Sequence, residues 1–321
     1  LPLSVDYQEK FAGAGKIPGN FFRRESKLSD YEVLISRLVD RAIRPLFDDD
    51  FVNETQIMIS LISGDPNNMP DCYAALAASA ALAVSDIPFN GPISEVRVAK
   101  INGEFLVNPS RQELAIAELD IIIAATMDNV MMVEGEAKEC QEADLVTAIK
   151  VGHEAIRVHC KAQLELANLV GEKATVKRVI EPLPVNEELA EKVKQACSDK
   201  IYAIARSASD KMTRKKAFDK VAEDFVAQLE AEMGEAYESS MGSEAGKLYD
   251  KLKKKIVRDV ILNEGLRLDG RKSDQVRPIW CEIDYIPSAH GSAIFNRGET
   301  QSLTSLTLGS KTDTLLIDNS L

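Results

Sequence analysis

The sequence predicts an α+β protein built in three parts. Two observations give this class. Strand-like segments and antiparallel hairpins accompany helices before residue 182, and strands return after residue 264. Between these parts, residues 186–263 place apolar side chains at helical spacing only. The predicted boundaries are therefore a first α+β core at 1–182, an all-helical domain at 183–263 and the truncated start of a second core at 264–321.

The first part begins with a stretch that we expect to be irregular, since residues 1–20 contain Gly13, Gly15 and Gly19. Ser29-Asp30-Tyr31-Glu32 is a capping-box pattern, which predicts a helix that ends at Pro45. Asn102-Gly103, the strongest short hairpin signal, predicts a turn between two strands. The remaining expected elements are strands at 56–62, 96–101, 104–107, 119–126 and 130–134 and helices at 71–85 and 142–170.

A change in composition at Pro182-Leu183-Pro184 marks the second part. Its apolar positions fall into three helical runs, which we expect Gly234 and Gly242 to separate. After Gly265 the pattern predicts strands again, at 279–286, 293–295 and 301–308. A segment of ~55 residues is too short to close a stable core by itself.

Composition limits the function classes. The net charge of −12 argues against a broad nucleic-acid-binding surface, so any RNA contact should be local and rich in arginine. No apolar run reaches the ~18 residues needed to cross a bilayer, so a membrane partner is not expected. The first residues show no secretory signal. The five cysteines are scattered and include no CxxC pair, which argues against a zinc knuckle and indicates the reducing cytoplasm.

The most informative local cluster is Phe21-Phe22-Arg23-Arg24, between the glycines and the capped helix. Aromatic faces stack on bases at ~1–3 kcal/mol each, and arginine forks bind phosphates through two hydrogen bonds. The alternative is that the phenylalanines enter the core while the arginines pair with Glu25 or Asp30. On the residues alone this alternative is the favoured one.

Three other patterns carry weaker signals. Arg37, Arg41 and Arg44 share one helical face, which could bind phosphate or be solvated and paired with acids such as Asp40. The basic stretches 211–220 and 247–258 contain interspersed acids and are expected to be solvated helix faces. Gly13-Ala14-Gly15-Lys16-Ile17 lacks the spacing of a nucleotide-binding loop. His153 and His159 are six residues apart on one expected helix, so they cannot jointly hold a metal. No complete catalytic site is visible.

Several longer segments resemble the polynucleotide phosphorylase family of bacteria. The first core of that family is matched by Gly15–Glu25, Leu34–Phe47 and Ile87–Ile93. The start of its second core is matched by Arg267–Arg271, Val276–Pro278, His290–Ala293 and Arg297–Gln301. The second set also resembles ribonuclease PH and the exosome ring subunits, which are single cores. A core, a helical domain and the start of another core resemble polynucleotide phosphorylase alone.

The resemblance implies a fold and an activity. Each core would be a ribonuclease PH-like mixed sheet with helices, and three subunits would form a ring with RNA in its central channel. Inorganic phosphate would attack the 3′ end of single-stranded RNA and release nucleoside diphosphates, with Mg²⁺ assisting and polymerisation as the reverse reaction. Such an enzyme serves mRNA degradation and RNA processing, with a nuclease or helicase as possible partner. It also implies that Phe21, Phe22, Arg23 and Arg24 bind RNA in the channel.

The resemblance implies omissions as well. The family's catalytic residues and metal-binding aspartates belong to the second core beyond Leu321, so we expect no catalytic or metal-binding residue in this chain. The first core lacks its opening strands, whose second-core counterparts are residues 267–309. We therefore expect the chain by itself to show little phosphorolysis. A non-catalytic ring subunit is the alternative, and the residues beyond Leu321 would decide between the two.

Overall fold

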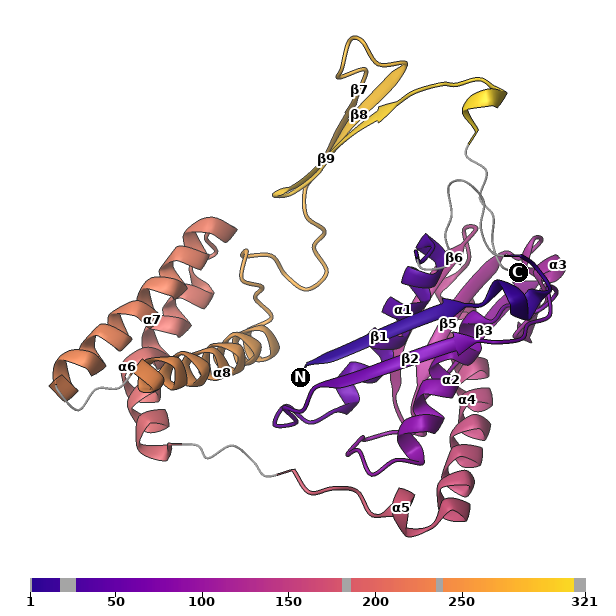
Figure 1. Ribbon diagram of the computed structural model, residues 1–321. Helices are drawn as coiled ribbons and strands as arrows, with labels where there is room; N and C mark the ends of the chain where they lie inside the picture. The colour runs from indigo at the N-terminus through magenta and orange to yellow at the C-terminus, as the bar shows by residue number, and fades with distance from the viewer. Residues whose placement is uncertain (1, 18–26, 181–185, 235–238, 315–321) are drawn as a thin grey trace. The chain divides into compact units, whose positions relative to one another are not determined.

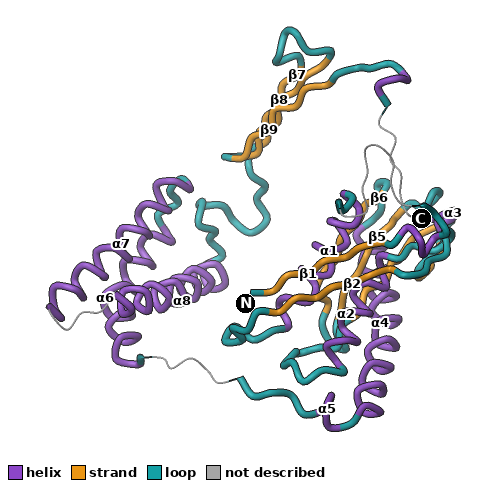
Figure 2. Tube along the Cα trace, in the orientation of Figure 1, coloured by secondary structure: helices purple, strands orange, loops and turns teal. Residues whose placement is uncertain are grey.

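The computed structural model describes residues 2–17, 27–180, 186–234 and 239–314 (Figure 1; Figure 2 colours the same view by secondary structure). Contacts divide the chain into one compact unit at Leu1–Leu183 and another that begins at Pro184 and extends to Leu315. The combination of helices and sheets confirms the predicted α+β class with an added helical region.

The first unit contains two sheets. A parallel pair places β1 beside β2 with Leu3 opposite Thr55 and Glu9 opposite Leu61. A four-stranded antiparallel sheet has the order β4-β3-β5-β6. The β3–β4 hairpin turns at Asn102-Gly103, and both residues have positive φ angles, as the predicted turn requires. The strands are β1 (Leu3–Glu9), β2 (Thr55–Leu61), β3 (Ser94–Ile101), β4 (Glu104–Val107), β5 (Leu119–Ala125) and β6 (Val130–Ala137).

Helices cover both faces of the four-stranded sheet (Figure 1). On one face α4 approaches closely at Gly152, where an added Cβ would lie 2.6 Å from a methyl group of Ile123. On the other face the alanine-rich α2 packs against β3, as its small side chains predict. The helical segments are η1 (Phe11–Ala14), α1 (Asp30–Ile43), η2 (Arg44–Leu46), α2 (Asp71–Ala83), α3 (Arg111–Leu114), α4 (Glu142–Val170) and α5 (Glu172–Thr175).

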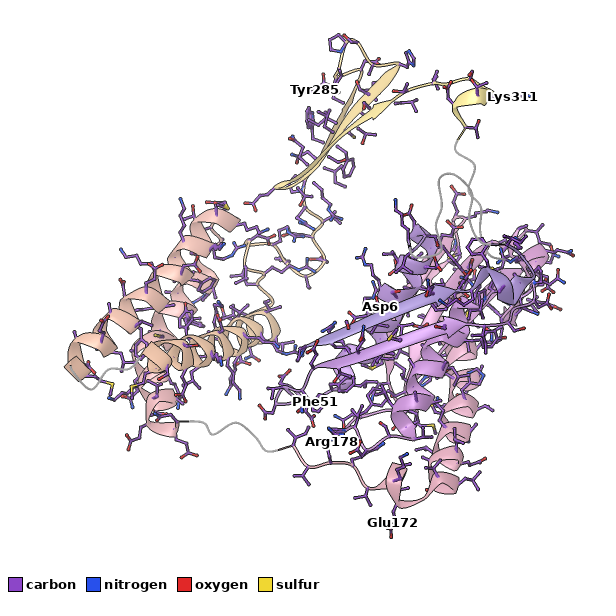
Figure 3. All side chains as sticks on the ribbon, viewed as in Figure 1. Asp6, Phe51, Glu172, Arg178, Tyr285 and Lys311 are labelled. Carbon is purple, nitrogen blue, oxygen red and sulfur yellow. The ribbon has the colours of Figure 1, made fainter. Side chains whose placement is uncertain are left out.

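After α5 the chain returns to the C-terminal end of α2. The Lys177 ammonium group donates hydrogen bonds to the carbonyl oxygens of Leu82, Ala83 and Ser85, so one cation binds three carbonyls at the C-terminal end of the helix. Arg178 pairs with Asp86 at 2.8 Å (Arg178 is labelled in Figure 3). Phe51, labelled in the same view, stacks on Phe47 with ring centroids 5.6 Å apart.

The prediction that residues 1–20 are irregular was wrong for their first half. Leu3, Tyr7 and Glu9 are buried while Ser4 and Asp6 are more exposed, so the segment alternates with a period of two and forms β1. The glycines that suggested a loop begin only at Gly13, after the strand has ended. The alternation is short and includes a buried glutamate, so the sequence pattern did not indicate a strand.

The second unit holds three helices around one apolar core: α6 (Glu187–Arg206), α7 (Lys211–Met233) and α8 (Ser239–Glu264). Gly234 ends α7 with a positive φ, as predicted. Gly242 was expected to separate helices, but it lies inside α8; a single glycine costs a helix only about 1 kcal/mol, which the rest of this long helix can offset. No helix of the described residues is both long and apolar enough for a membrane crossing.

Strands return after α8 in an antiparallel meander. The order is β7-β8-β9, and the β8–β9 turn places Gly298 at a φ of 61°. The predicted middle strand at 293–295 is longer in the structure, because pairing on both sides extends it to the turn residues. The bounds are β7 (Ile279–Ile283), β8 (Gly291–Arg297), β9 (Thr300–Leu306) and the short helix η4 (Lys311–Asp313).

Candidate functional site

The strongest predicted binding cluster, Phe21-Phe22-Arg23-Arg24, lies outside the described residues. Its assignment to RNA therefore stays a prediction. The structure does describe the two segments that lead into this cluster, from Glu9 to Ile17 and from Lys27 onward.

One carboxylate joins the two flanking segments. Glu32 Oε1 accepts a hydrogen bond from the backbone N–H of Glu9 at 2.8 Å. Its Oε2 accepts from the backbone N–H of Ser29 at 2.6 Å and from the Ser29 hydroxyl at 2.8 Å. Glu32 is only 2% exposed, so these contacts are largely shielded from water. A single side chain thus completes the capping box of α1 and fixes the end of β1 beside the start of that helix.

Helix α1 also satisfies a second backbone donor of β1. The N–H of Tyr7 donates to Ser36 Oγ at 2.9 Å, and the Tyr7 hydroxyl donates to Glu9 Oε1 at 3.0 Å. Burial and the nearby Glu9 carboxylate raise the pKa of Tyr7 far above its ordinary value, so this hydroxyl remains a donor. Buried N–H groups on a strand edge need such partners. Side chains of α1 therefore hold β1 in place.

The chain beyond β1 lies against the end of β2. The N–H of Lys10 donates to the carbonyl oxygen of Leu61 at 3.0 Å. At Gly13 an added Cβ would lie 2.5 Å from the carbonyl oxygen of Ile62, so only glycine permits this approach. Gly13 therefore has a packing role, which agrees with its rejection as part of a nucleotide-binding loop.

The arginine face of α1 is ion-paired in part. Arg41 pairs with Glu134 of β6 at 2.5 Å, and Arg44 pairs with Asp40 and donates to the carbonyl oxygen of Leu3 at 2.9 Å. Arg37 is exposed and has no ion-pair partner among the described residues. It lines a hollow of about 320 Å³ together with Asp40 and Arg44. Two of the three arginines are therefore paired within the first unit, whereas Arg37 is exposed.

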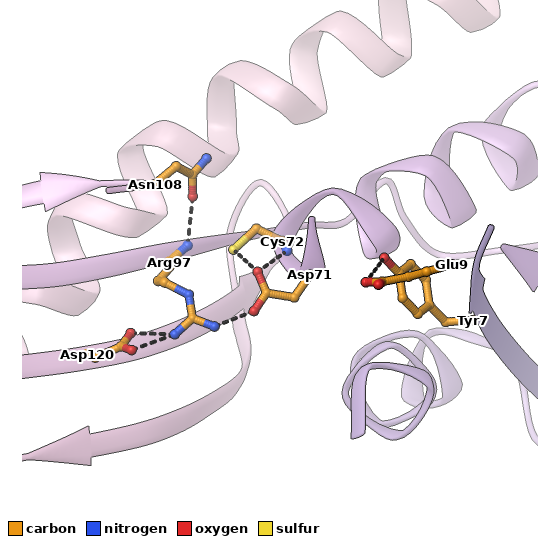
Figure 4. A network of polar contacts seen from close by, with 7 residues as sticks. All are labelled: Tyr7, Glu9, Asp71, Cys72, Arg97, Asn108 and Asp120. Carbon is orange, nitrogen blue, oxygen red and sulfur yellow. Dashed lines mark hydrogen bonds and ion pairs between the residues drawn. The ribbon is translucent and has the colours of Figure 1, made fainter. Parts of the chain in front are cut away.

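A buried ion network joins α2 to the four-stranded sheet (Figure 4). The Arg97 guanidinium of β3 pairs with Asp71 at the start of α2 and with Asp120 of β5, the latter at 2.6 Å. The Arg97 backbone N–H donates to Asn108 Oδ1 at 2.9 Å. The Cys72 thiol donates to Asp71 Oδ1 at 3.3 Å. One cation thereby holds a helix and two strands together.

The surroundings of this network shift the ionisation of its neighbours. Burial, followed by repulsion from Asp71, raises the pKa of Glu95 from 4.5 to about 8, so the carboxyl group is mainly protonated at neutral pH. Burial likewise raises the pKa of the Cys72 thiol, which keeps it protonated and unreactive. Nothing in this cluster is exposed enough to receive a polymer. We interpret it as structural.

The histidines serve separate partners. His153 Nε2 contacts the carbonyl oxygen of Thr126 at 3.0 Å, whereas His159 Nδ1 contacts Ser94 Oγ at 3.0 Å. In the second unit, His290 Nδ1 accepts a hydrogen bond from the N–H of Leu308 at 3.0 Å. Across the described parts of the chain no three His, Cys, Asp or Glu side chains are grouped so that they could hold a metal ion.

The motif Arg267-Leu268-Asp269-Gly270-Arg271 forms a compact turn in the second unit. The N–H of Arg267 donates to the carbonyl oxygen of Arg271 at 2.9 Å, and Arg271 Nε donates to Asp269 at 2.9 Å. Gly270 has a φ of 80°, which glycine adopts without strain. The charged residues of the motif thus support the turn itself.

Sequence reasoning missed the double role of Glu32. The capping-box pattern identified the bond to Ser29, but nothing in the spacing indicated the bond to Glu9, which is 23 residues away. The signal that could have found it is the polar Glu9 on the buried face of a strand, since a buried backbone donor beside it requires a partner. The pairing of Arg97 with both Asp71 and Asp120 was missed for the same reason.

Comparison with known protein families gives four matches along the chain. The family model described as "3' exoribonuclease family, domain 1" matches residues 1–88 and again residues 275–319. "3' exoribonuclease family, domain 2" matches 91–155. "Polyribonucleotide nucleotidyltransferase, RNA binding domain" matches 188–272.

Individual relatives agree with these matches. Proteins named polyribonucleotide nucleotidyltransferase from Bacteroides fragilis and Amoebophilus asiaticus are each 54% identical, over 99% and 100% of this chain. One from Porphyromonas gingivalis is 51% identical over 99% of the chain. The chain spans 44%, 44% and 42% of these three relatives, which is less than half of their length.

Proposed function

Because this chain belongs to the polyribonucleotide nucleotidyltransferase family, we propose that the protein of which it forms part is a 3′-to-5′ phosphorolytic exoribonuclease. One observation carries the proposal. The same exoribonuclease domain model matches the chain twice, at 1–88 and 275–319, on either side of a helical domain. A single-core ribonuclease would match once. We accordingly keep the division at 1–182, 183–263 and 264–321.

The proposed reaction uses inorganic phosphate as the nucleophile at the 3′-terminal phosphodiester of single-stranded RNA. The terminal nucleotide leaves as a nucleoside diphosphate, and the reverse reaction adds nucleotides to a 3′ end with release of phosphate. Mg²⁺ would neutralise the charge that develops on the phosphoryl oxygens. From the resemblance to its family, we assign the metal and the catalytic residues to the second core, beyond Leu321.

Within this chain we propose that Phe21, Phe22, Arg23 and Arg24 hold RNA. The clamp formed by Glu32 supports this role, because it fixes both flanking segments and leaves the intervening residues between two ordered ends. Arg37 on the neighbouring helix face is exposed and could add one phosphate contact.

We further propose a homotrimer that works in the cytoplasm in mRNA degradation and RNA processing, with an associated nuclease or helicase. The family of the relatives supports the enzyme class. The free thiols of Cys72, Cys160 and Cys197, all buried, suit a reducing compartment.

The test is the identity of the product. Full-length protein is incubated with a single-stranded oligoribonucleotide, Mg²⁺ and labelled inorganic phosphate. We expect the label in nucleoside diphosphates and no shortening of RNA when phosphate is omitted. Release of nucleoside monophosphates without phosphate would identify a hydrolase and refute the proposal. No product under either condition would favour a non-catalytic ring subunit.

A further inference from the structure

Helix α8 presents a row of positive charge on one side. Lys247, Lys251, Lys254 and Arg258 follow each other at intervals of three and four residues, so they share one face, and Lys255 lies beside them. All five side chains are exposed. Among the described residues none of the five has an ion-pair or hydrogen-bond partner. We refer to these five residues as the α8 basic row.

The opposite side of α8 fixes the direction of this row. Ala245, Tyr249 and Val260 are at most 2% exposed, and Leu252 and Ile256 pack against the same core with α6 and α7. The Tyr249 hydroxyl donates to the carbonyl oxygen of Phe218 at 2.8 Å. The helix therefore cannot rotate to turn the basic row inward without loss of this core. The row must face solvent or a ligand.

Among the described residues, the acids of α8 form no ion pair with the row. Asp250 pairs with Lys253, which lies outside the row, at 2.6 Å. Glu244, at the start of the same face, accepts a hydrogen bond from the N–H of Asn186 at 3.2 Å. Asp259 lies at the edge of the row, toward α6. In a chain with a net charge of −12, five neighbouring cations without partners are a local exception.

We propose that the α8 basic row binds the sugar-phosphate backbone of single-stranded RNA. From Lys247 to Arg258 the row extends about 16 Å at 1.5 Å per residue, which allows contacts with successive phosphates. Like charges at this spacing repel each other, which costs free energy in the unbound helix. A bound polyanion neutralises these charges and releases its own counterions, and both effects favour binding. The row contains no aromatic side chain, so binding should not depend on base sequence. The inference rests on the proposed function, since it takes RNA as the substrate class. Within the region that the RNA-binding domain model matches, it assigns the phosphate contacts to one face of α8.

The neighbouring groove is a poorer phosphate site. A hollow of about 390 Å³ between α6 and α8 is lined by Lys194 and Lys255 but also by Asp199, Asp259 and Glu264. Glu264 pairs with Arg206 at 2.9 Å, and the two remaining carboxylates balance the two ammonium groups, so the hollow offers an anion no net positive charge. The phosphate contacts therefore belong on the outer face of α8.

The experiment compares two triple variants of the 321-residue chain. The row variant carries Lys251→Gln, Lys254→Gln and Arg258→Gln. The control carries Lys192→Gln, Lys200→Gln and Lys220→Gln, which removes the same charge from exposed positions on α6 and α7. Binding of a fluorescent single-stranded oligoadenylate is followed by anisotropy over a range of salt concentrations, and circular dichroism verifies that helical content is unchanged.

We expect the row variant to bind about tenfold or more weakly at 0.1 M salt. The slope of log affinity against log salt should become shallower by about 2, since each bound phosphate of a single strand contributes about 0.7. The control should change affinity less than twofold. Equal losses in both variants, or no loss in the row variant, would overturn the proposal. So would displacement of the RNA by polyglutamate as efficiently as by unlabelled RNA, which would assign the row to an acidic protein segment. Product analysis of the full-length protein tests the proposed reaction independently, so the two ideas can fail separately.

Discussion

Replacement of Glu32 by alanine tests how the chain positions its predicted RNA loop. The substitution removes both carboxylate oxygens, and with them the hydrogen bonds to Glu9 and Ser29. We expect the end of β1 and the start of α1 to separate more often, while the rest of the first unit stays folded. The buried apolar residues of α1, such as Ile35 and Val39, keep their contacts.

The magnitude follows from the exposure of the two donors. Glu9 is 4% exposed, so its N–H cannot reach water, and leaving it without a partner costs about 1–3 kcal/mol. Ser29 is partly exposed, so water replaces part of the missing cap and that contribution is about 1 kcal/mol. The local opening should therefore become easier by about 2–4 kcal/mol. At 1.4 kcal/mol for each factor of ten, this is roughly a 30-fold to 1,000-fold faster amide exchange.

The assay is hydrogen–deuterium exchange of peptides that contain Glu9 and Ser29. Glu113→Ala is the matched control, because Ser110 and Glu113 form the same capping box on α3 without a long-range contact. This variant should change exchange only around α3. In the full-length protein, Glu32→Ala should weaken RNA binding and Glu113→Ala should not. Unchanged exchange at Glu9 in the Glu32 variant would refute the clamp.

Three further predictions concern the buried network and the loop itself. Arg97→Met should destabilise the first unit by about 3–5 kcal/mol, because it leaves Asp71 buried without its cation. The pKa of Glu95 is raised from 4.5 to about 8, so between these pH values the folded state holds a proton that the unfolded chain has lost. The free energy of unfolding should therefore decrease as pH rises through that interval. In the Glu95→Gln variant this decrease should be smaller. In the full-length protein, Arg23→Ala with Arg24→Ala should weaken RNA binding and make the salt slope shallower by about 0.7 for each phosphate that the variant no longer binds.

Each of these has a simple readout. Limited proteolysis and thermal unfolding report the first unit, and a stable Arg97 variant would show that the network contributes little. For Glu95, urea unfolding at several pH values gives the profile, and an equally steep fall in the glutamine variant would place the proton elsewhere. For the two arginines, an unchanged salt slope would remove them from the RNA path.

Much of the fold could be predicted because local signals were strong. The hairpin at Asn102-Gly103 and the helix at 142–170 appear where turn chemistry and periodicity place them. The capping box at Ser29 is present with both of its hydrogen bonds. In each case residues close in sequence determine the structure, so the pattern is visible without tertiary information.

What could not be predicted depends on residues far apart in sequence. Strand β1 is stabilised by β2 and by side chains of α1, and its own alternation is short. Gly242 lies within a helix because the cost of one glycine, about 1 kcal/mol, is small beside the packing of the rest of α8 against the helical core. The basic stretch at 247–258 was expected to be a solvated face; it is exposed, but only its position opposite the core showed that five of its cations form one row.

This chain should hold RNA, while the phosphorolytic chemistry should belong to residues outside it. One measurement follows both properties in a single sample of the 321-residue chain, with labelled phosphate, Mg²⁺ and a fluorescent single-stranded RNA. We predict salt-dependent RNA binding with no release of nucleoside diphosphates above background, next to a full-length protein that releases them. Robust diphosphate release by the chain alone, or no RNA binding at any salt concentration, would contradict this division of roles.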